Sequence, residues 1–207
     1  MNPNTRKNQN LHGNTPDSCP VALLLIDVIN DLDFPGNSRL LKKAPQLGKN
    51  IAELKMRCRK AGIPAIYAND NRGRWRSDFS KVLTHCTQRD SPGRTFVTRL
   101  IPDDTDYLVL KPKHSAFYAT PLDTLLSYLE VKTVILVGLT TNACILMTAG
   151  EAYVRDLNIY VPPDCVAALN DTIHKNALQL MKTSFNVKTV RGKQIDLRKL
   201  VRRAEMQ

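Results

Sequence analysis

The sequence predicts an α/β protein, a three-layer αβα sandwich around a doubly wound, mostly parallel sheet of about six strands. Four segments are continuously apolar, as strands are when both faces of their sheet are covered. Stretches with helical spacing separate these segments, so that each strand is joined to the next by a crossover. No apolar run approaches the roughly 20 residues of a membrane span, which argues against an integral membrane protein.

The predicted elements follow from local signals along the chain. The strands are expected at residues 21–27, 64–70, 106–111 and 133–138, with a fifth at 158–161 and a final edge strand at 187–190. The helices are expected at residues 46–61, 78–86, 122–129, from Cys144 to Leu157, and at 171–185. Gly62 and Pro64 end the first helix, and Pro121 precedes the third.

The length of 207 residues predicts one domain, over residues 19–207, preceded by an N-terminal arm at residues 1–18. We expect the arm to be flexible because its residues are polar and turn-forming. It lacks the apolar centre of a secretory signal, so a cytoplasmic location is expected.

Five cysteines are spread along the chain without a Cys-x-x-Cys pair or a Cys/His cluster at zinc spacing. Neither a disulfide framework nor a structural zinc site is therefore predicted. The formal charge is +11, and basic residues gather near the end of the sequence. No recognisable nucleic-acid-binding motif accompanies them, so a solvated tail or a subunit contact is favoured over nucleic-acid binding.

Three reactive side chains end or follow predicted strands: Asp27 closes the first, Lys111 closes the third, and Cys144 follows the fourth. Ligands of doubly wound sheets bind at this end of the strands. A cysteine at the start of a helix is expected to have a lowered pKa, a lysine could stabilise its thiolate, and a carboxylate could exchange its proton. The same spacing equally permits a buried inert cysteine, a turn-capping aspartate and a surface lysine.

The segments around these residues resemble the isochorismatase-like cysteine hydrolase superfamily. The first is an apolar run ending in Asp, followed by a polar loop with Phe, as in ALLLIDVINDLDFPG; the second has Lys and then Ser-Ala-Phe, as in LVLKPKHSAFYATPLDTLL. The third combines strand, glycine, turn, cysteine and helix in VILVGLTTNACILMTAGEA. The resemblance spans residues 21–170 and implies a Rossmann-like fold of the isochorismatase type.

The resemblance implies a catalytic triad of Asp27, Lys111 and Cys144. It also implies a cis peptide bond between Leu139 and Thr140, and an oxyanion hole formed by the backbone N–H groups of Thr140 and Cys144. Asp27 would deprotonate Cys144, the thiolate would attack a carbonyl carbon, and water would hydrolyse the thioester. Lys113 is the nearest rival for the lysine role, but Lys111 matches the motif.

The expected activity is hydrolysis of a carbon–nitrogen bond in a small amide, carbamoyl or ureido substrate, without a metal or other cofactor. Nicotinamidases of the superfamily carry an Asp-x-His metal pattern after the second strand, and here no histidine occurs between His12 and His85. One alternative is vinyl ether cleavage of the isochorismatase type, and another is a catalytically silent binding or assembly module. The resemblance further implies a homo-oligomer, either a dimer or a tetramer.

Loops beside the predicted triad supply candidates for substrate binding, although each aromatic residue among them could equally be structural. One arginine near the single tryptophan is a candidate for binding a substrate carboxylate. His114 follows Lys111 closely, but we assign it no role at this point because its position varies in the family and Asp27 already supplies a base. The candidates are Phe34, Asn69, Asn71, Arg74, Trp75, Phe117 and Tyr118.

Overall fold

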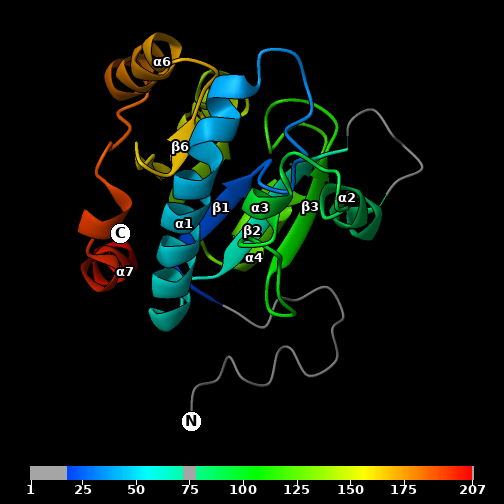
Figure 1. The fold of residues 1–207 in the computed structure, drawn as a ribbon. Coiled ribbons are helices and arrows are strands. Elements are labelled where there is room, and N and C mark those ends of the chain that lie inside the picture. Colours follow the sequence, from blue (N-terminus) through cyan, green and yellow to red (C-terminus); the bar gives the residue numbers. More distant parts are fainter. Residues whose placement is uncertain (1–17, 72–77, 207) are drawn as a thin grey trace.

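The computed structural model describes residues 18–71 and 78–206, and it confirms the α/β class. A six-stranded sheet has the order β3-β2-β1-β4-β5, and β6 pairs with β4. The pairings between these strands are all parallel. The chain builds β2 and β3 on one side of β1 and then crosses to β4 on the other side (Figure 1). The strands are β1 Val21–Ile26, β2 Ala65–Asp70, β3 Tyr107–Lys111, β4 Thr133–Leu139, β5 Asn158–Tyr160 and β6 Val166–Ala167.

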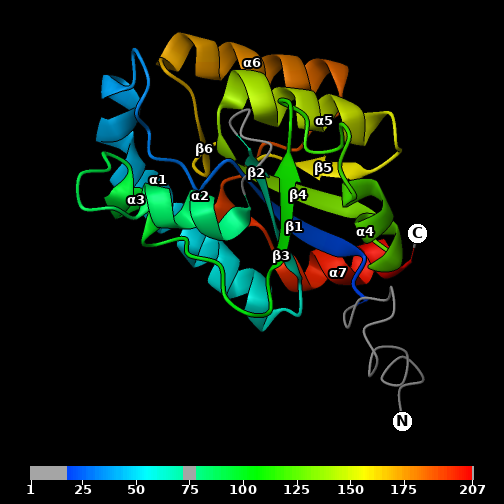
Figure 2. The same ribbon diagram turned by 90° about the vertical axis from the view of Figure 1, so that its right-hand side faces the viewer.

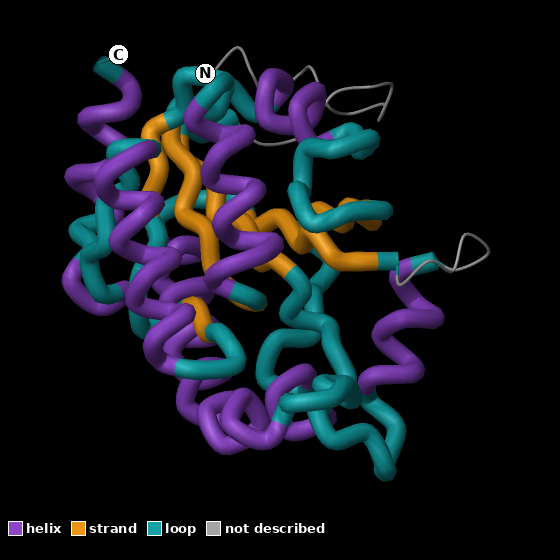
Figure 3. Tube along the Cα trace, turned by 90° about the horizontal axis from the view of Figure 1, so that it is seen from above, coloured by secondary structure: helices purple, strands orange, loops and turns teal. Residues whose placement is uncertain are grey.

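Helices cover both faces of this sheet, as the view turned by 90° shows (Figure 2). Helices α1, α2, α3 and α7 contribute to the apolar cluster on one face, and α4, α5 and α6 to the cluster on the other. Seen from above, the strands form the middle of the molecule (Figure 3). The helices are α1 Ser38–Lys60, α2 Phe79–Cys86, α3 Arg94–Val97, α4 Leu122–Tyr128, α5 Leu146–Tyr153, α6 Asp171–Ser184 and α7 Leu197–Glu205, with a π-helical turn η2 at Thr141–Ile145 and a 3-10 turn η3 at Gly192–Gln194.

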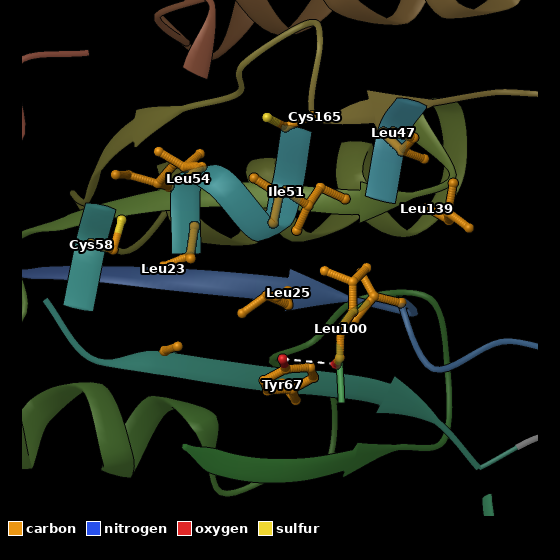
Figure 4. Packing of buried hydrophobic residues seen from close by; sticks show 14 of the residues in the cluster. Leu23, Leu25, Leu47, Ile51, Leu54, Cys58, Tyr67, Leu100, Leu139 and Cys165 are labelled. Carbon is orange, nitrogen blue, oxygen red and sulfur yellow. Dashed lines mark hydrogen bonds between the residues drawn. The ribbon is translucent and has the colours of Figure 1, made fainter. Parts of the chain in front are cut away.

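The core between α1 and the sheet is built from alternate strand residues and one stripe of the helix (Figure 4). Leu25 of β1 faces α1, where Ile51 and Leu54 are almost completely buried. Tyr67 of β2 is also buried, and its hydroxyl group donates a 2.9 Å hydrogen bond to the Leu100 carbonyl. Each fully buried apolar side chain of this kind contributes about 1.5–3 kcal/mol, so this layer anchors the sheet from which the candidate site projects.

The helix after β1 begins at Ser38, eight residues before the predicted start, and contains Pro45. Proline disfavours the interior of a helix because it lacks an N–H group and crowds the preceding turn. Leu40 and Ala44 are buried against the core, and their burial offsets the missing hydrogen bond.

The C-terminal part of the chain differs from its prediction in two ways. The expected edge strand at 187–190 is reduced to an isolated bridge between Lys188 and Tyr160. Beyond it, the basic segment forms α7, whose Leu197, Leu200 and Ala204 are buried. The basic side chains occupy the exposed face of a helix docked on the core, so this segment is not a solvated tail. No helix in the described ranges is long and apolar enough to cross a membrane.

Candidate active site

Strand register brings the three predicted triad residues to one edge of the sheet. Asp27 directly follows β1, whose last residue lies opposite Gly138 of β4, and Lys111 ends β3 opposite Asp70 of β2. Because β2 separates β1 from β3, Lys111 starts about 10 Å from the strand that leads to Asp27. A long side chain is therefore needed to join the two ends, and lysine has the required length.

Asp27 is buried where the chain turns away from the sheet. Its backbone has φ 52°, in the left-handed region that non-glycine residues rarely adopt. One carboxylate oxygen, Oδ1, accepts a 2.7 Å hydrogen bond from the Asp70 backbone N–H, and the other, Oδ2, lies 2.8 Å from the Lys111 ammonium group. Such strained conformations are found at functional sites because neighbouring contacts hold them in place.

Lys111 connects the acid to the sulfur. Its side chain is completely buried, and its Nζ lies 3.4 Å from Cys144 Sγ as well as 2.8 Å from Asp27 Oδ2. Nζ also donates a 3.1 Å hydrogen bond to the Lys113 carbonyl and lies 3.7 Å from the Asp70 carboxylate. These four contacts satisfy a charge that would be very costly to bury alone.

Cys144 lies in the turn between β4 and α5, and 8% of its surface is exposed. The peptide bond between Leu139 and Thr140 is cis. The next residues form the π-helical turn η2, in which the Thr140 carbonyl accepts hydrogen bonds from the N–H groups of Ala143 and Ile145. Neither of these two hydrogen bonds uses the N–H group of Cys144, the residue between Ala143 and Ile145.

Gly138 permits the close approach of β4 to β1 beneath this turn. Its φ is 115°, and a Cβ atom at this position would lie only 2.0 Å from the Ile26 carbonyl oxygen. Any side chain would therefore push apart the two strands that carry Asp27 and Cys144. Glycine is therefore needed at position 138 for two reasons, the positive φ and the close packing of β4 against β1.

Burial dominates the electrostatics of the site. It raises the pKa of Asp27 despite the opposing attraction of Lys111. Burial alone would lower the pKa of Lys111, but the negative charges of Asp27 and Cys144 outweigh it and raise that pKa. Burial and the Asp27 carboxylate raise the pKa of Cys144 to about 12, against the lowering effect of Lys111. The lowered thiol pKa expected from a helix N-terminus is therefore wrong for this site: desolvation is the larger effect.

The predicted substrate-binding residues have varied surroundings. Asn69 is buried, and its amide group exchanges hydrogen bonds of 3.0 and 2.9 Å with the backbone of Ile29, which fastens the loop after β1. The buried backbone N–H of Asn71 donates a 3.1 Å bond to the Lys111 carbonyl. These contacts give both asparagines a structural role beside the triad, and their contribution to substrate binding stays a prediction.

The aromatic candidates differ in exposure. Phe117 is buried, with the Arg155 guanidinium 4.5 Å from its ring centroid, whereas Tyr118 is 56% exposed. Phe34 is half-buried against the cluster on the α1 face. Arg74 and Trp75 lie outside the described residues, so the proposed carboxylate contact stays a prediction.

His114 is the functional candidate that sequence reasoning set aside. Its Nδ1 lies 3.6 Å from Cys144 Sγ, so a second ionisable group contacts the sulfur in addition to Lys111. Its position three residues after the lysine that ends β3 was the available signal. Spacing alone could not show that the following loop turns back toward the cysteine.

The residues at this edge do not fit the metal site of nicotinamidases. Asp70 ends β2, but Arg72 stands two positions later, where the pattern requires histidine. Within residues 18–71 and 78–206, no group of three or more His, Cys, Asp or Glu side chains is arranged to hold a metal ion. We therefore derive no chemical step that uses one.

A parallel doubly wound sheet with a cysteine, a lysine and an aspartate in contact at its carboxyl edge defines the class of isochorismatase-like proteins. The family model described as the Isochorismatase domain matches residues 21–191, and the chain belongs to this family.

Two curated relatives and one solved structure illustrate the similarity. The uncharacterized isochorismatase family protein YaaI of Bacillus subtilis is 40% identical over 161 residues, covering 78% of this chain and 88% of YaaI. Nicotinamidase 3 of Arabidopsis thaliana is 27% identical over 176 residues, covering 82% and 84% of the two chains. The crystal structure of N-carbamoylsarcosine amidase from Thermoplasma acidophilum has a TM-score of 0.67 and 25% identity, covering 85% of this chain and 98% of that one.

Proposed function

We propose that the chain is a cysteine-dependent hydrolase that cleaves a carbon–nitrogen bond of a small amide, carbamoyl or ureido substrate through a thioester. The observation that carries this proposal is the position of the Lys111 ammonium group, 2.8 Å from Asp27 Oδ2 and 3.4 Å from Cys144 Sγ. A nucleophile, an acid–base group and a cation within contact of each other are the parts that acyl transfer requires.

The first half-reaction forms the thioester. A base removes the thiol proton of Cys144, and Asp27 is suited to this role because burial raises its pKa above that of an ordinary carboxylate. The thiolate attacks the carbonyl carbon, and the carbon–nitrogen bond breaks as the leaving nitrogen accepts the proton that Asp27 took from the thiol. The backbone N–H groups of Thr140 and Cys144 are the proposed donors to the oxyanion, and one such donor is worth about 3–4 kcal/mol in the transition state.

The second half-reaction returns the free enzyme. Asp27 takes a proton from water, the hydroxide oxygen attacks the thioester carbon, and the carbon–sulfur bond breaks with the thiolate as leaving group. The proton on Asp27 then returns to Cys144 Sγ, which restores the thiol and the carboxylate. Lys111 would stabilise the negative charge on sulfur at the beginning and at the end of the cycle, since its Nζ contacts Sγ. The substrate is a small molecule, and Tyr118 is a candidate contact because it is exposed next to the buried Phe117.

The names of two relatives, N-carbamoylsarcosine amidase and nicotinamidase, support carbon–nitrogen cleavage. The carbamoyl class is favoured over nicotinamide because the Asp-x-His metal pattern is absent from the sequence. Vinyl ether hydrolysis remains the second candidate. It is less favoured because the contact between Lys111 and Cys144 serves a sulfur nucleophile, which ether cleavage does not require.

The test is a screen of small amides, carbamoyl and ureido compounds, nicotinamide and isochorismate, in which the release of ammonia or pyruvate is measured. We expect an amide-type substrate to be turned over by the wild-type protein and by Cys58→Ala, but not by Cys144→Ala. Cys58 is a matched control because it is a buried cysteine of α1 in the apolar cluster on the other face of the sheet.

Equal turnover by Cys144→Ala and the wild-type protein would refute the nucleophile assignment. Release of pyruvate from isochorismate by both cysteine variants would favour the ether hydrolase. A silent binding module would show no turnover and no covalent acyl adduct on Cys144 in intact-mass spectra with any compound of the screen.

A further inference from the structure

An open cavity lies at the end of the molecule opposite the candidate active site. The last turn of α1, the turn η3 and the first turn of α7 line it, and its volume is about 420 Å³. Figure 1 shows α7 beside the C-terminal half of α1. Because α1 ends at Lys60 and leads into β2 at Ala65, the cavity adjoins the amino ends of the strands. Its volume is within the range of pockets that bind small organic molecules.

Positive charge dominates the lining of this cavity. Four of the lining side chains are positively charged and one, Asp196, is negatively charged, which leaves a net charge of +3. Within residues 18–71 and 78–206, none of the four positive side chains forms an ion pair with a carboxylate. Their mutual repulsion is therefore not relieved by the protein, and an anion placed between them would relieve it. The four are Arg57, Lys60, Lys193 and Arg198.

Arg57 is fixed in place at the wall of the cavity. Its guanidinium group donates hydrogen bonds of 2.7 Å to the Gly192 carbonyl and 2.6 Å to the Ile195 carbonyl, and both acceptors are neutral. These bonds fasten the end of α1 to the turn η3 without neutralising the charge. Arginine has five N–H donors, so others remain for a ligand, and an anion would find this group already oriented.

The positions of the cations in their helices favour a ligand over a purely structural role. Arg57 and Lys60 lie in the last turn of α1, where the helix dipole stabilises positive charge, so a structural role would explain these two. Arg198 lies in the first turn of α7, where the dipole favours negative charge and no acidic residue is present. Asp196 caps this turn through the Lys199 N–H, and other N–H groups of the turn have no partner within the helix. An arginine at this end of a helix is unfavourable unless an anion binds there.

We infer that this cavity is a binding site for a small molecule that carries a diphosphate group. One phosphate group carries a charge of about −1.5 to −2, so two such groups match a net charge of +3 more closely than one does. Arg57 and Arg198 offer the planar donor pairs that suit phosphate oxygens, and Lys60 and Lys193 supply point charges. The site is separate from Cys144, so the inference does not depend on the proposed hydrolase activity.

The test is calorimetric titration of the full chain with inorganic pyrophosphate, and separately with inorganic phosphate, at about 0.15 M NaCl. The variants Lys193→Gln and Arg198→Gln each remove one charge of the lining, and both side chains are exposed, so the core is left intact. Arg203→Gln is the matched control. It removes the same charge from the exposed surface of α7, but five residues after Arg198 and therefore about 140° around the helix.

We expect the wild-type protein to bind pyrophosphate with a Kd below about 1 mM, and phosphate at least about 10-fold more weakly. Each lining variant should raise the Kd for pyrophosphate at least about 10-fold, the effect of losing one charge-assisted hydrogen bond. Arg203→Gln should change it less than about 2-fold, because salt screens an exposed charge outside the cavity. Without ligand, Arg198→Gln should melt at no lower temperature than the wild type, since its arginine opposes the helix dipole.

Four results would overturn the inference. The first is a wild-type Kd for pyrophosphate above about 1 mM. The second is equal weakening by Arg198→Gln and Arg203→Gln, which would indicate diffuse attraction to a positive surface. The third is tighter binding of single-stranded RNA with equal dependence on these two arginines, which would indicate a nucleic-acid surface along α7. The fourth is loss of binding in Cys144→Ala, which would place the anion at the candidate active site; we expect this variant to bind as the wild type does.

Discussion

Replacing Lys111 with methionine removes the positive charge that contacts the buried carboxylate of Asp27. At the observed separation of 2.8 Å, the attraction between the two charges is about 6 kcal/mol for an effective dielectric constant of about 20. Part of this attraction is offset in the variant, because methionine avoids the cost of burying an ammonium group. Removing one member of a buried ion pair typically lowers the free energy of unfolding by about 3–5 kcal/mol, and we expect a decrease of this size near pH 8.

This loss should depend on pH in a defined direction. Burial already raises the pKa of Asp27 above its ordinary value of 3.8, and without Lys111 the pKa rises further. The folded protein then holds a proton at pH values where the unfolded chain has released it. Stability therefore decreases as the pH rises from about 3.8 through the raised pKa of the folded state, and the deficit of Lys111→Met relative to the wild type shrinks on acidification.

The assay is urea unfolding followed by far-UV circular dichroism near pH 8, 6 and 5. The double variant Asp27→Asn/Lys111→Met is the matched control. It removes both charges, and an asparagine Oδ1 can still accept the hydrogen bond from the Asp70 backbone N–H. We expect the free energy of unfolding of this double variant to lie within about 2 kcal/mol of the wild-type value. A Lys111→Met deficit below about 1 kcal/mol near pH 8, or one that does not change with pH, would refute the electrostatic reasoning.

The remaining predictions concern the supports of the site. Gly138→Ala should lower the free energy of unfolding by at least about 3 kcal/mol. The φ of 115° is strained for alanine, and its Cβ atom would lie 2.0 Å from a carbonyl oxygen of β1. Gly36→Ala, with φ 80° and no atom within 4 Å of its Cβ, should cost only about 1–2 kcal/mol, and equal thermal shifts would contradict the close-approach argument. Asn170→Ala removes the N-cap hydrogen bond that the Ile173 N–H donates to Asn170 Oδ1, and it should lower the free energy of unfolding by about 1 kcal/mol. Asn176→Ala on the exposed face of α6 is the control, and it should leave the free energy measured by urea unfolding nearly unchanged.

The strands were predictable because their signal is local. Strands covered on both faces require apolar residues throughout, as in Val21–Ile26, and this pattern locates them without knowledge of their neighbours. The start of α1 was missed because Pro45 is a local helix-breaking signal, while the burial that overrides it comes from contacts with the sheet. The basic C-terminal segment was misinterpreted for the same reason: its charges are visible in the sequence, but the docking of Leu200 on the core is not.

The candidate site was likewise predictable from the sequence only in part. The positions of Asp27, Lys111 and Cys144 followed from strand ends and from the family resemblance. Their contacts at 2.8 and 3.4 Å depend on strand order and on the length of a lysine side chain that reaches across β2. The approach of His114 to the sulfur depends on hydrogen bonds between a loop and α5, which connect residues 32 positions apart.

The sequence by itself determined that this protein would form a parallel sheet with three reactive side chains at its carboxyl edge, because apolar periodicity and strand-ending residues are written locally. Only the tertiary structure decided which charges touch the sulfur and in which direction the pKa of Cys144 moves. Desolvation and Coulomb energy depend on distances between residues that are remote in the chain, and those distances exist only after the strands have taken their order.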